Sequence, residues 1–345
     1  MKLFLQIFFT LVIFLKTGNV LSENNLFNVD NILIKKKDGD TNEQLASKAI
    51  KKGFDQLINR LLLNEDRSKV SNIDYSSIKQ LIQYYNIDKN RNNQNNLVNF
   101  SVTFDKDKIH NLFYKENISY SYILDKEFYI LPIVIFKNDI FIFSNNYFYD
   151  NWNKTEDIKL IEFIPLLENI EIIQKINQSR NNLLDLKLEL IFQEYFDKNL
   201  ALILIENFNT EEKIYLKAKI QDKIIVKRFS FQKKDSDKGK FYEEIIINLK
   251  EDITNLVKSQ NLIDIRAPSF LNVRLNLKND FNLVKLNSKI KNISLIENMF
   301  VQEFNKDNVL IKIKYLGKLE KIKNQLKEEN INLHQINDQW IISNK

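Results

Sequence analysis

Residues 271–277 read LNVRLNL, so that leucine or valine at every second position alternates with a polar residue. This two-residue period predicts a β-strand with one buried and one solvated face. Just downstream, Asp280 is predicted to cap a helix whose apolar residues include Val284 and Leu286. The strand and the helix together indicate a small mixed α and β module.

The rest of this module continues in the same manner. Strands are predicted at 293–304, 309–315, 331–333 and 339–342, and a second helix bears Leu319, Ile322 and Leu326. Read in order, the elements give βαββαβ with an extra strand, which is the split-βαβ pattern. We therefore predict a C-terminal ferredoxin-like domain at 266–345.

Two upstream regions also alternate between strand and helix patterns. In the first, Thr41 and Gln44 form a capping box before an amphipathic helix, and 98–104 alternate as a strand. In the second, strands are predicted at 160–164, 200–205, 214–220 and 223–231, helices at 183–196 and 241–258, and a solvated loop at 233–240. The sequence thus predicts an α+β protein of two or three small α/β-sandwich modules in series. An N-terminal domain at 23–151 and a middle domain at 152–265 precede the C-terminal one.

The first 22 residues have the three parts of a signal peptide. Lys2 supplies the positive charge, 3–15 form an apolar run, and Val20 and Ser22 are small enough for a cleavage site before Glu23. The run is shorter than the roughly 20 residues that a membrane-spanning helix needs. We expect export to the periplasm and no membrane span after cleavage. An uncleaved anchor and a buried N-terminal helix remain alternatives.

The composition excludes several classes of site. The chain has 345 residues and no cysteine, which rules out disulfides, thiolate zinc sites and cysteine lipidation. Loss of Lys2 and Lys16 with the signal peptide lowers the formal charge from +6 to +4. The remaining bases are interspersed with acids, as on a solvated helix face, so no nucleic-acid partner is predicted.

Three segments carry a family resemblance. They are ASKAIKKGFDQLINRL at 46–61, NFSVTFDKDKIHNLFYKENISY at 99–120 and LPIVIF at 131–136. With the signal peptide, this series resembles the proteobacterial envelope proteins classed as domain of unknown function 2066. The chain differs from that family at Leu131, where a basic residue is usual. Since the family has no established activity, the resemblance implies an envelope location and an architecture only.

No residue is assigned to a catalytic, cofactor-binding or metal site. The two histidines, His110 and His334, lack a carboxylate or second histidine at ligand spacing. Two carboxylate pairs are candidates, Glu243–Glu244 and Asp185 with Glu189, and solvated helix faces are the preferred interpretation of both. No cofactor is predicted.

Aromatic residues offer the remaining candidates. Trp152, Trp340 and the run 147–149 are interpreted as core or interface packing, with a ligand groove as the alternative.

These observations lead to two functional hypotheses. The first is a non-enzymatic periplasmic envelope protein, an interaction or assembly adaptor with an envelope protein as partner. The alternative is a hydrolase that uses a carboxylate pair on cell-wall or glycan material.

Overall fold

The computed structural model describes residues 26–88, 96–123, 126–155, 160–207, 211–233, 237–277 and 282–344. It confirms an α+β fold built from several small sheets. The chain divides into two compact units: one combines the chain up to Tyr120 with the chain from Leu262 onward, and the other is Ser121–Asn261. Each unit is described by itself.

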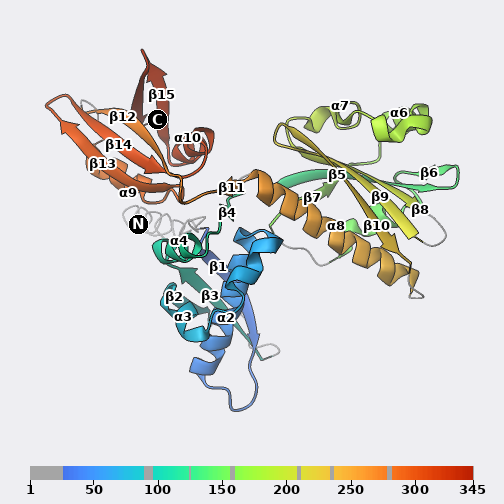
Figure 1. Ribbon diagram of the computed structural model, residues 1–345, viewed down its shortest axis with the longest axis horizontal. Coiled ribbons are helices and arrows are strands. Elements are labelled where there is room, and N and C mark those ends of the chain that lie inside the picture. The colour runs from blue at the N-terminus through green and yellow to red at the C-terminus, as the bar shows by residue number, and fades with distance from the viewer. Residues whose placement is uncertain are drawn as a thin grey trace, which may run out of the picture. The chain divides into compact units, whose positions relative to one another are not determined.

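The N-terminal part of the first unit is a three-stranded antiparallel sheet with helices (Figure 1). Its elements are β1 (Asn28–Lys35), α2 (Asn42–Leu61), a 3-10 helix (Asn64–Val70), α3 (Tyr75–Gln80), β2 (Ile82–Asp88), β3 (Leu97–Phe104) and α4 (Lys106–Lys115). The sheet order is β1-β3-β2. The segment that gives α3 and β2 carried no prediction, since its apolar residues follow neither period clearly.

Helix α2 begins where the sequence predicts. The Thr41 hydroxyl accepts from the Gln44 backbone N–H at 3.2 Å, and the Gln44 side chain accepts from the Thr41 N–H at 3.0 Å. The helix packs closely on the sheet at Gly53, where an added Cβ would lie 2.9 Å from Ile32 Cδ1 and 3.5 Å from Val102 Cβ. Glycine is therefore needed for this close approach.

The C-terminal part of the same unit is a five-stranded sheet. Its elements are β12 (Ser269–Asn276), α9 (Leu283–Ile290), β13 (Ile296–Phe304), β14 (Asn308–Tyr315), α10 (Leu319–Glu328), β15 (Ile331–Ile336) and β16 (Gln339–Asn344), preceded by the short β11 (Leu262–Ile263), which pairs with β4 (Tyr120–Ser121). The strand order is β13-β14-β12-β16-β15. Helix α9 is capped by Asn282, and the predicted cap Asp280 lies outside the described residues.

The strand that is additional to the βαββαβ pattern, β16, lies inside this sheet. The first split βαβ has the predicted form, because β14 lies between β12 and β13 and is antiparallel to both. The second split βαβ unit is β14-α10-β15. Here β16 pairs in parallel with β12 and lies between β12 and β15. The two-residue turn at Asn337 and Asp338, both with positive φ, folds β16 back along β15. The C-terminal domain is thus a ferredoxin-like sheet with one inserted strand.

Contacts between α4 and β13 join the two parts of the first unit. The Lys106 ammonium donates to the Ile296 carbonyl at 2.8 Å and lies 3.6 Å from Glu297. His110 Nδ1 lies 3.1 Å from Glu297 Oε1. These residues are almost 200 positions apart in the sequence, so no local pattern predicts their contact.

The second unit is a six-stranded mixed sheet covered on both faces. Its elements are β5 (Glu127–Phe136), β6 (Asp139–Phe141), α5 (Tyr147–Asn151), β7 (Glu162–Pro165), α6 (Ile170–Gln178), α7 (Leu188–Ile191), β8 (Asn199–Asn207), β9 (Glu211–Ile220), β10 (Lys223–Gln232) and α8 (Lys238–Gln260). The order is β10-β9-β8-β5-β6, and β7 also pairs with β5. Strands β5 and β8 are parallel neighbours.

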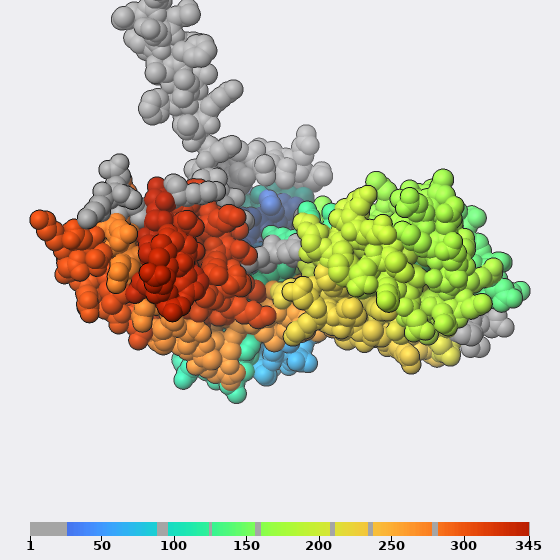
Figure 2. All heavy atoms as spheres, turned by 90° about the horizontal axis from the view of Figure 1, so that it is seen from above, coloured from blue at the N-terminus to red at the C-terminus, as the bar shows by residue number. Residues whose placement is uncertain are grey.

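Strand β8 is buried on both faces. Its odd-numbered residues, Ala201 among them, pack with α8, and its even-numbered residues, such as Leu202, pack with α6 and α7. Figure 1 shows α8 on one side of the sheet and α6 and α7 on the other. Figure 2 shows the side chains of the α6 and α7 region covering one side of this unit. This double burial explains the continuous apolar run of β8.

Three sequence predictions require correction here. The boundary at 151 is wrong, because β5 pairs with β7 and β8, so the second unit begins at Ser121. The helix at 183–196 is wrong, because the extended backbone at Lys187 and a break at Phe192 leave only α7 as α-helix, between 3-10 turns at Arg180–Asp185 and Gln193–Tyr195. The predicted loop at 233–240 ends earlier, because Asp237 caps α8 and the helix begins at Lys238.

Within the described ranges, no helix has the length and apolar character needed to cross a membrane.

Candidate ligand-binding cavity in the middle unit

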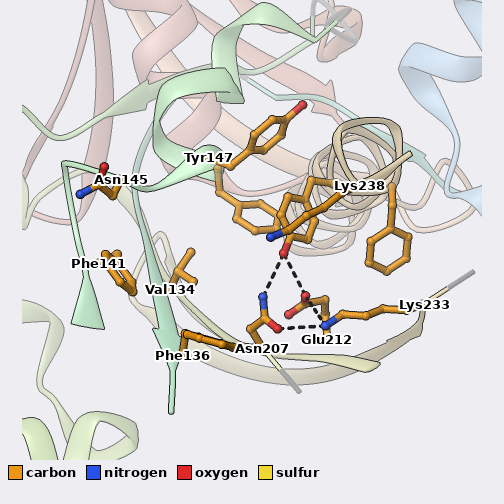
Figure 3. Close-up of a pocket in the computed structure, with 12 residues that line it drawn as sticks. Val134, Phe136, Phe141, Asn145, Tyr147, Asn207, Glu212, Lys233 and Lys238 are labelled. Carbon is orange, nitrogen blue, oxygen red and sulfur yellow. Dashed lines mark hydrogen bonds and ion pairs between the residues drawn. The ribbon is translucent and has the colours of Figure 1, made fainter. Parts of the chain in front are cut away.

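A cavity of about 530 Å³ opens at one end of the middle sheet (Figure 3). The parallel strands β5 and β8 both end there, at Phe136 and Asn207, and the first turn of α8 faces them. In α/β sheets, ligands bind outside the carboxyl ends of parallel strands, and small-molecule sites have volumes of roughly 300–1,000 Å³. Both its position and its size are those of a ligand site.

Apolar side chains form most of the wall. Val134 and Phe136 share one face of β5, Phe141 comes from β6, and Tyr147 and Phe148 come from α5. On the same face of β5, the earlier residues Phe128 and Ile130 are fully buried with α8. Phe136, at the end of the strand, is 38% exposed. The cavity therefore lies where the apolar face of β5 ceases to be fully covered.

The buried Asn146 holds α5 in position. Its Nδ2 donates to the carbonyls of Pro132, Phe141 and Ile142 at 2.9, 3.1 and 2.7 Å. Its Oδ1 accepts from the backbone N–H groups of the first turn of α5. One side chain thus caps the helix and ties it to β5 and β6, which fixes the aromatic wall.

Four polar side chains form a closed ring at the other side of the cavity. Asn207 Nδ2 donates to Tyr242 Oη at 2.9 Å, and Tyr242 Oη donates to Glu212 Oε1 at 3.2 Å. Lys233 Nζ lies 3.3 Å from Glu212 Oε1 and donates to Asn207 Oδ1 at 2.9 Å. Figure 3 shows the ring beside the apolar side chains of β5 and β6.

Glu212 is fully buried, with 0% of its surface exposed. Burial raises the pKa of this carboxyl, and Lys233 and the Tyr242 hydrogen bond oppose that shift. Burial also raises the pKa of the Tyr242 hydroxyl, and the Glu212 charge adds to the rise. Glu212 Oε2 has no hydrogen-bond partner among the described residues. A free buried carboxylate oxygen is costly, so this atom marks the point where a donor is missing.

Lys238 lies at the mouth of the cavity. Its ammonium lies over the Tyr242 ring, 5.4 Å from the centroid, and Figure 3 shows it directed toward the interior. The part of the chain that the structure describes contains no carboxylate within ion-pair distance of it. The cavity thus offers one compensated acid and one exposed cation.

The chain matches no protein-family model, no curated protein and no solved structure. The assignment of this site therefore rests on its geometry.

The histidines and tryptophans from the sequence analysis lie elsewhere. His110 contacts Glu297 in the first unit, and His334 lies on β15. Trp152 is fully buried beside Phe163, and Trp340 lies under the Lys323 ammonium. None of the four lines the cavity.

The carboxylate pairs also remain apart from the cavity. Glu243 and Glu244 are exposed on α8, and Asp185 and Glu189 are exposed before and on α7. Of the aromatic run 147–149, Tyr147 and Phe148 line the cavity, which agrees with the groove alternative for those two residues. Among the described residues there is no group of three or more His, Asp or Glu side chains placed to hold a metal ion.

Sequence reasoning missed the polar ring, although one signal was present. Ile214, Leu216 and Ala218 are the inward positions of β9, and the same alternation extended by two residues reaches Glu212. A charged residue at an inward position of a strand indicates a special site. Lys233 and Asn207 gave no comparable signal, because they lie at strand ends.

Proposed function

We propose that the protein is a non-enzymatic binding protein of the bacterial envelope that holds a small amphipathic ligand in the middle-unit cavity. The apolar body of the ligand contacts the aromatic wall, and an N–H or O–H group donates to Glu212 Oε2. The free oxygen of this fully buried carboxylate is the observation that carries the proposal.

The polar ring favours binding over catalysis. Glu212 already accepts hydrogen bonds from Tyr242 and Lys233, which hold it in place. A glycosidase-type mechanism needs two carboxyl groups about 5–9.5 Å apart. Among the described residues that line the cavity, Glu212 is the only acid, so the hydrolase alternative lacks its second carboxylate here.

The envelope location is part of the proposal. Its support is the signal-peptide pattern of 1–22, which lies outside the described residues, and the resemblance to the envelope family. Mass spectrometry of the protein from its host tests this point. A chain that starts near Glu23 is expected, and an intact Met1 would contradict cleavage.

Fluorescence titration with N-phenyl-1-naphthylamine tests the cavity. This neutral probe has an apolar body and one N–H donor. We expect saturable binding by the full chain, weakened about tenfold in Phe136→Ser because the variant removes a large part of the apolar wall. Phe270→Ser is the matched control, since Phe270 is a 51% exposed strand phenylalanine in the other unit. An unsaturable signal, or equal binding by Phe136→Ser, would overturn the proposal.

A second candidate function is the adaptor hypothesis, in which an envelope partner protein binds at β13. This strand is an edge of the five-stranded sheet, and it exposes Phe300, Val301 and Phe304. Edge strands with apolar side chains pair readily with extended segments of other chains.

In-cell photo-crosslinking distinguishes this candidate. A photoreactive phenylalanine analogue at position 304 is expected to capture one reproducible envelope protein. The same analogue at 284, on α9, is the control because Val284 is 77% exposed and lies off the edge strand. Equal capture from both positions would count against a specific site on β13.

A further inference from the structure

The charges that line the cavity do not cancel. Its lining contains the carboxylate Glu212 and the ammonium groups of Lys233 and Lys238. Lys233 pairs with Glu212 at 3.3 Å, and the charge of Lys238 also acts on that carboxylate, so the three groups leave one net positive charge, which Lys238 carries at the mouth. The neighbouring Asp237 is outside the lining, and its carboxylate caps α8 by accepting from the Gly239 N–H at 3.0 Å.

The excess charge lies next to apolar surface. Lys238 is directed into the same space that Val134 and Phe136 border (Figure 3). A cation beside a partly desolvated apolar wall interacts with an anion more strongly than one surrounded by water does. The tyrosine ring beneath the ammonium also restricts its positions, which lowers the entropy lost on binding.

We infer that the ligand is an organic monoanion with an apolar body, whose anionic group pairs with Lys238. This inference rests on the proposed function, because it assigns the charge of the ligand held in the same cavity. The donor group contacts Glu212, the body contacts the phenylalanines, and the anionic group lies at the mouth. Carboxylates and sulfonates both have the required chemistry.

A pair of probes separates the charge from the apolar body. 5-Anilinonaphthalene-1-sulfonate has the ring system and free N–H group of N-phenyl-1-naphthylamine and adds one sulfonate on the other ring. With the full chain, we expect the sulfonate probe to bind about tenfold more tightly than the neutral probe, as a charge-assisted contact predicts. In Lys238→Gln, this difference between the two probes is expected to vanish, because the sulfonate loses its contact with the ammonium.

The matched control is Lys240→Gln, because Lys240 is also exposed in the first turn of α8 but is outside the cavity lining. It should retain the full difference between the two probes. Equal affinities in the unaltered chain, or equal losses in the two lysine variants, would overturn the inference and leave the cavity itself intact. Failure of both probes to bind would instead reject the proposed function.

Discussion

A buried carboxylate is stable only when its charge is compensated, and in this chain Lys233 compensates Glu212. The carboxylate is fully buried, whereas the Lys233 side chain is 27% exposed. Removal of one partner from such a pair leaves an uncompensated charge, which costs about 3–5 kcal/mol when both groups are buried. Without Lys233, Glu212 would keep only the Tyr242 hydrogen bond and the weaker attraction of Lys238.

We therefore predict that Lys233→Met lowers the free energy of unfolding by about 3 kcal/mol near neutral pH. The control is Lys227→Met, because Lys227 forms an exposed contact with Asp252 at 3.9 Å. It should cost under about 1 kcal/mol. Urea denaturation of both variants checks the difference.

The pH dependence of the same variant has a definite sign. The folded-state pKa of Glu212 is raised above its ordinary value, so the folded protein binds a proton more tightly than the unfolded chain. Stability therefore falls as the pH rises from the ordinary value through the folded-state pKa. Loss of Lys233 raises that pKa further, so the defect should be larger at about pH 8 than at about pH 5. A defect that is independent of pH would contradict this assignment.

At the scale of single elements, Asn146 shows how one side chain positions a wall of the site. It caps α5 and donates to three carbonyls of the chain around β5 and β6. We expect Asn146→Ala to cost about 3 kcal/mol, because it removes a helix cap and leaves buried groups unpaired. Binding of the neutral probe should weaken as well, since α5 carries Tyr147 and Phe148.

The control for this prediction is Asn169→Ala. Asn169 caps α6 by accepting from the Glu171 N–H at 2.7 Å, but α6 contributes nothing to the cavity. It should cost about 1 kcal/mol and leave probe binding unchanged. Thermal unfolding and titration of both variants provide the test, and equal effects on binding would show that Asn146 has no special positioning role.

At the scale of the whole molecule, the second unit has its own core. Both large apolar clusters of the sheet lie within 121–261. We predict that this fragment, expressed alone, unfolds cooperatively and binds the neutral probe with the affinity of the full chain. Circular dichroism and fluorescence titration check this expectation. A fragment that remains unfolded would show that the sheet depends on the first unit.

The first unit depends on contacts between distant segments. The contact with His110 lowers the pKa of Glu297, against its burial, and Lys106 lowers it further. The stability contributed by this carboxylate is present above its ordinary pKa and is lost as the pH falls through the lowered value. We predict that Glu297→Gln destabilises the unit at neutral pH and flattens its acid unfolding, measured by chemical denaturation across the acid range.

The sequence predicted the elements whose signals are local. The capping box at Thr41 and the alternation of β12 involve residues only a few positions apart, and the structure has both. Prediction was wrong where the helical preference was weak, as in the helix at 183–196, where Lys187 and Phe192 leave the helical conformation and the chain continues in short turns.

The sequence alone thus determined the class of the fold, the approximate first and last residues of most strands and helices, and the absence of cysteine chemistry. Only the tertiary structure decided that β5 belongs with β8, that the two ends of the chain form one unit, and that Glu212, Tyr242, Lys233 and Asn207 meet in a ring. The physical reason is the distance along the chain over which each feature is determined. Turns, caps and periodicity depend on neighbours along the chain, whereas strand pairing and the meeting of polar side chains depend on the free energy of the whole packed sheet.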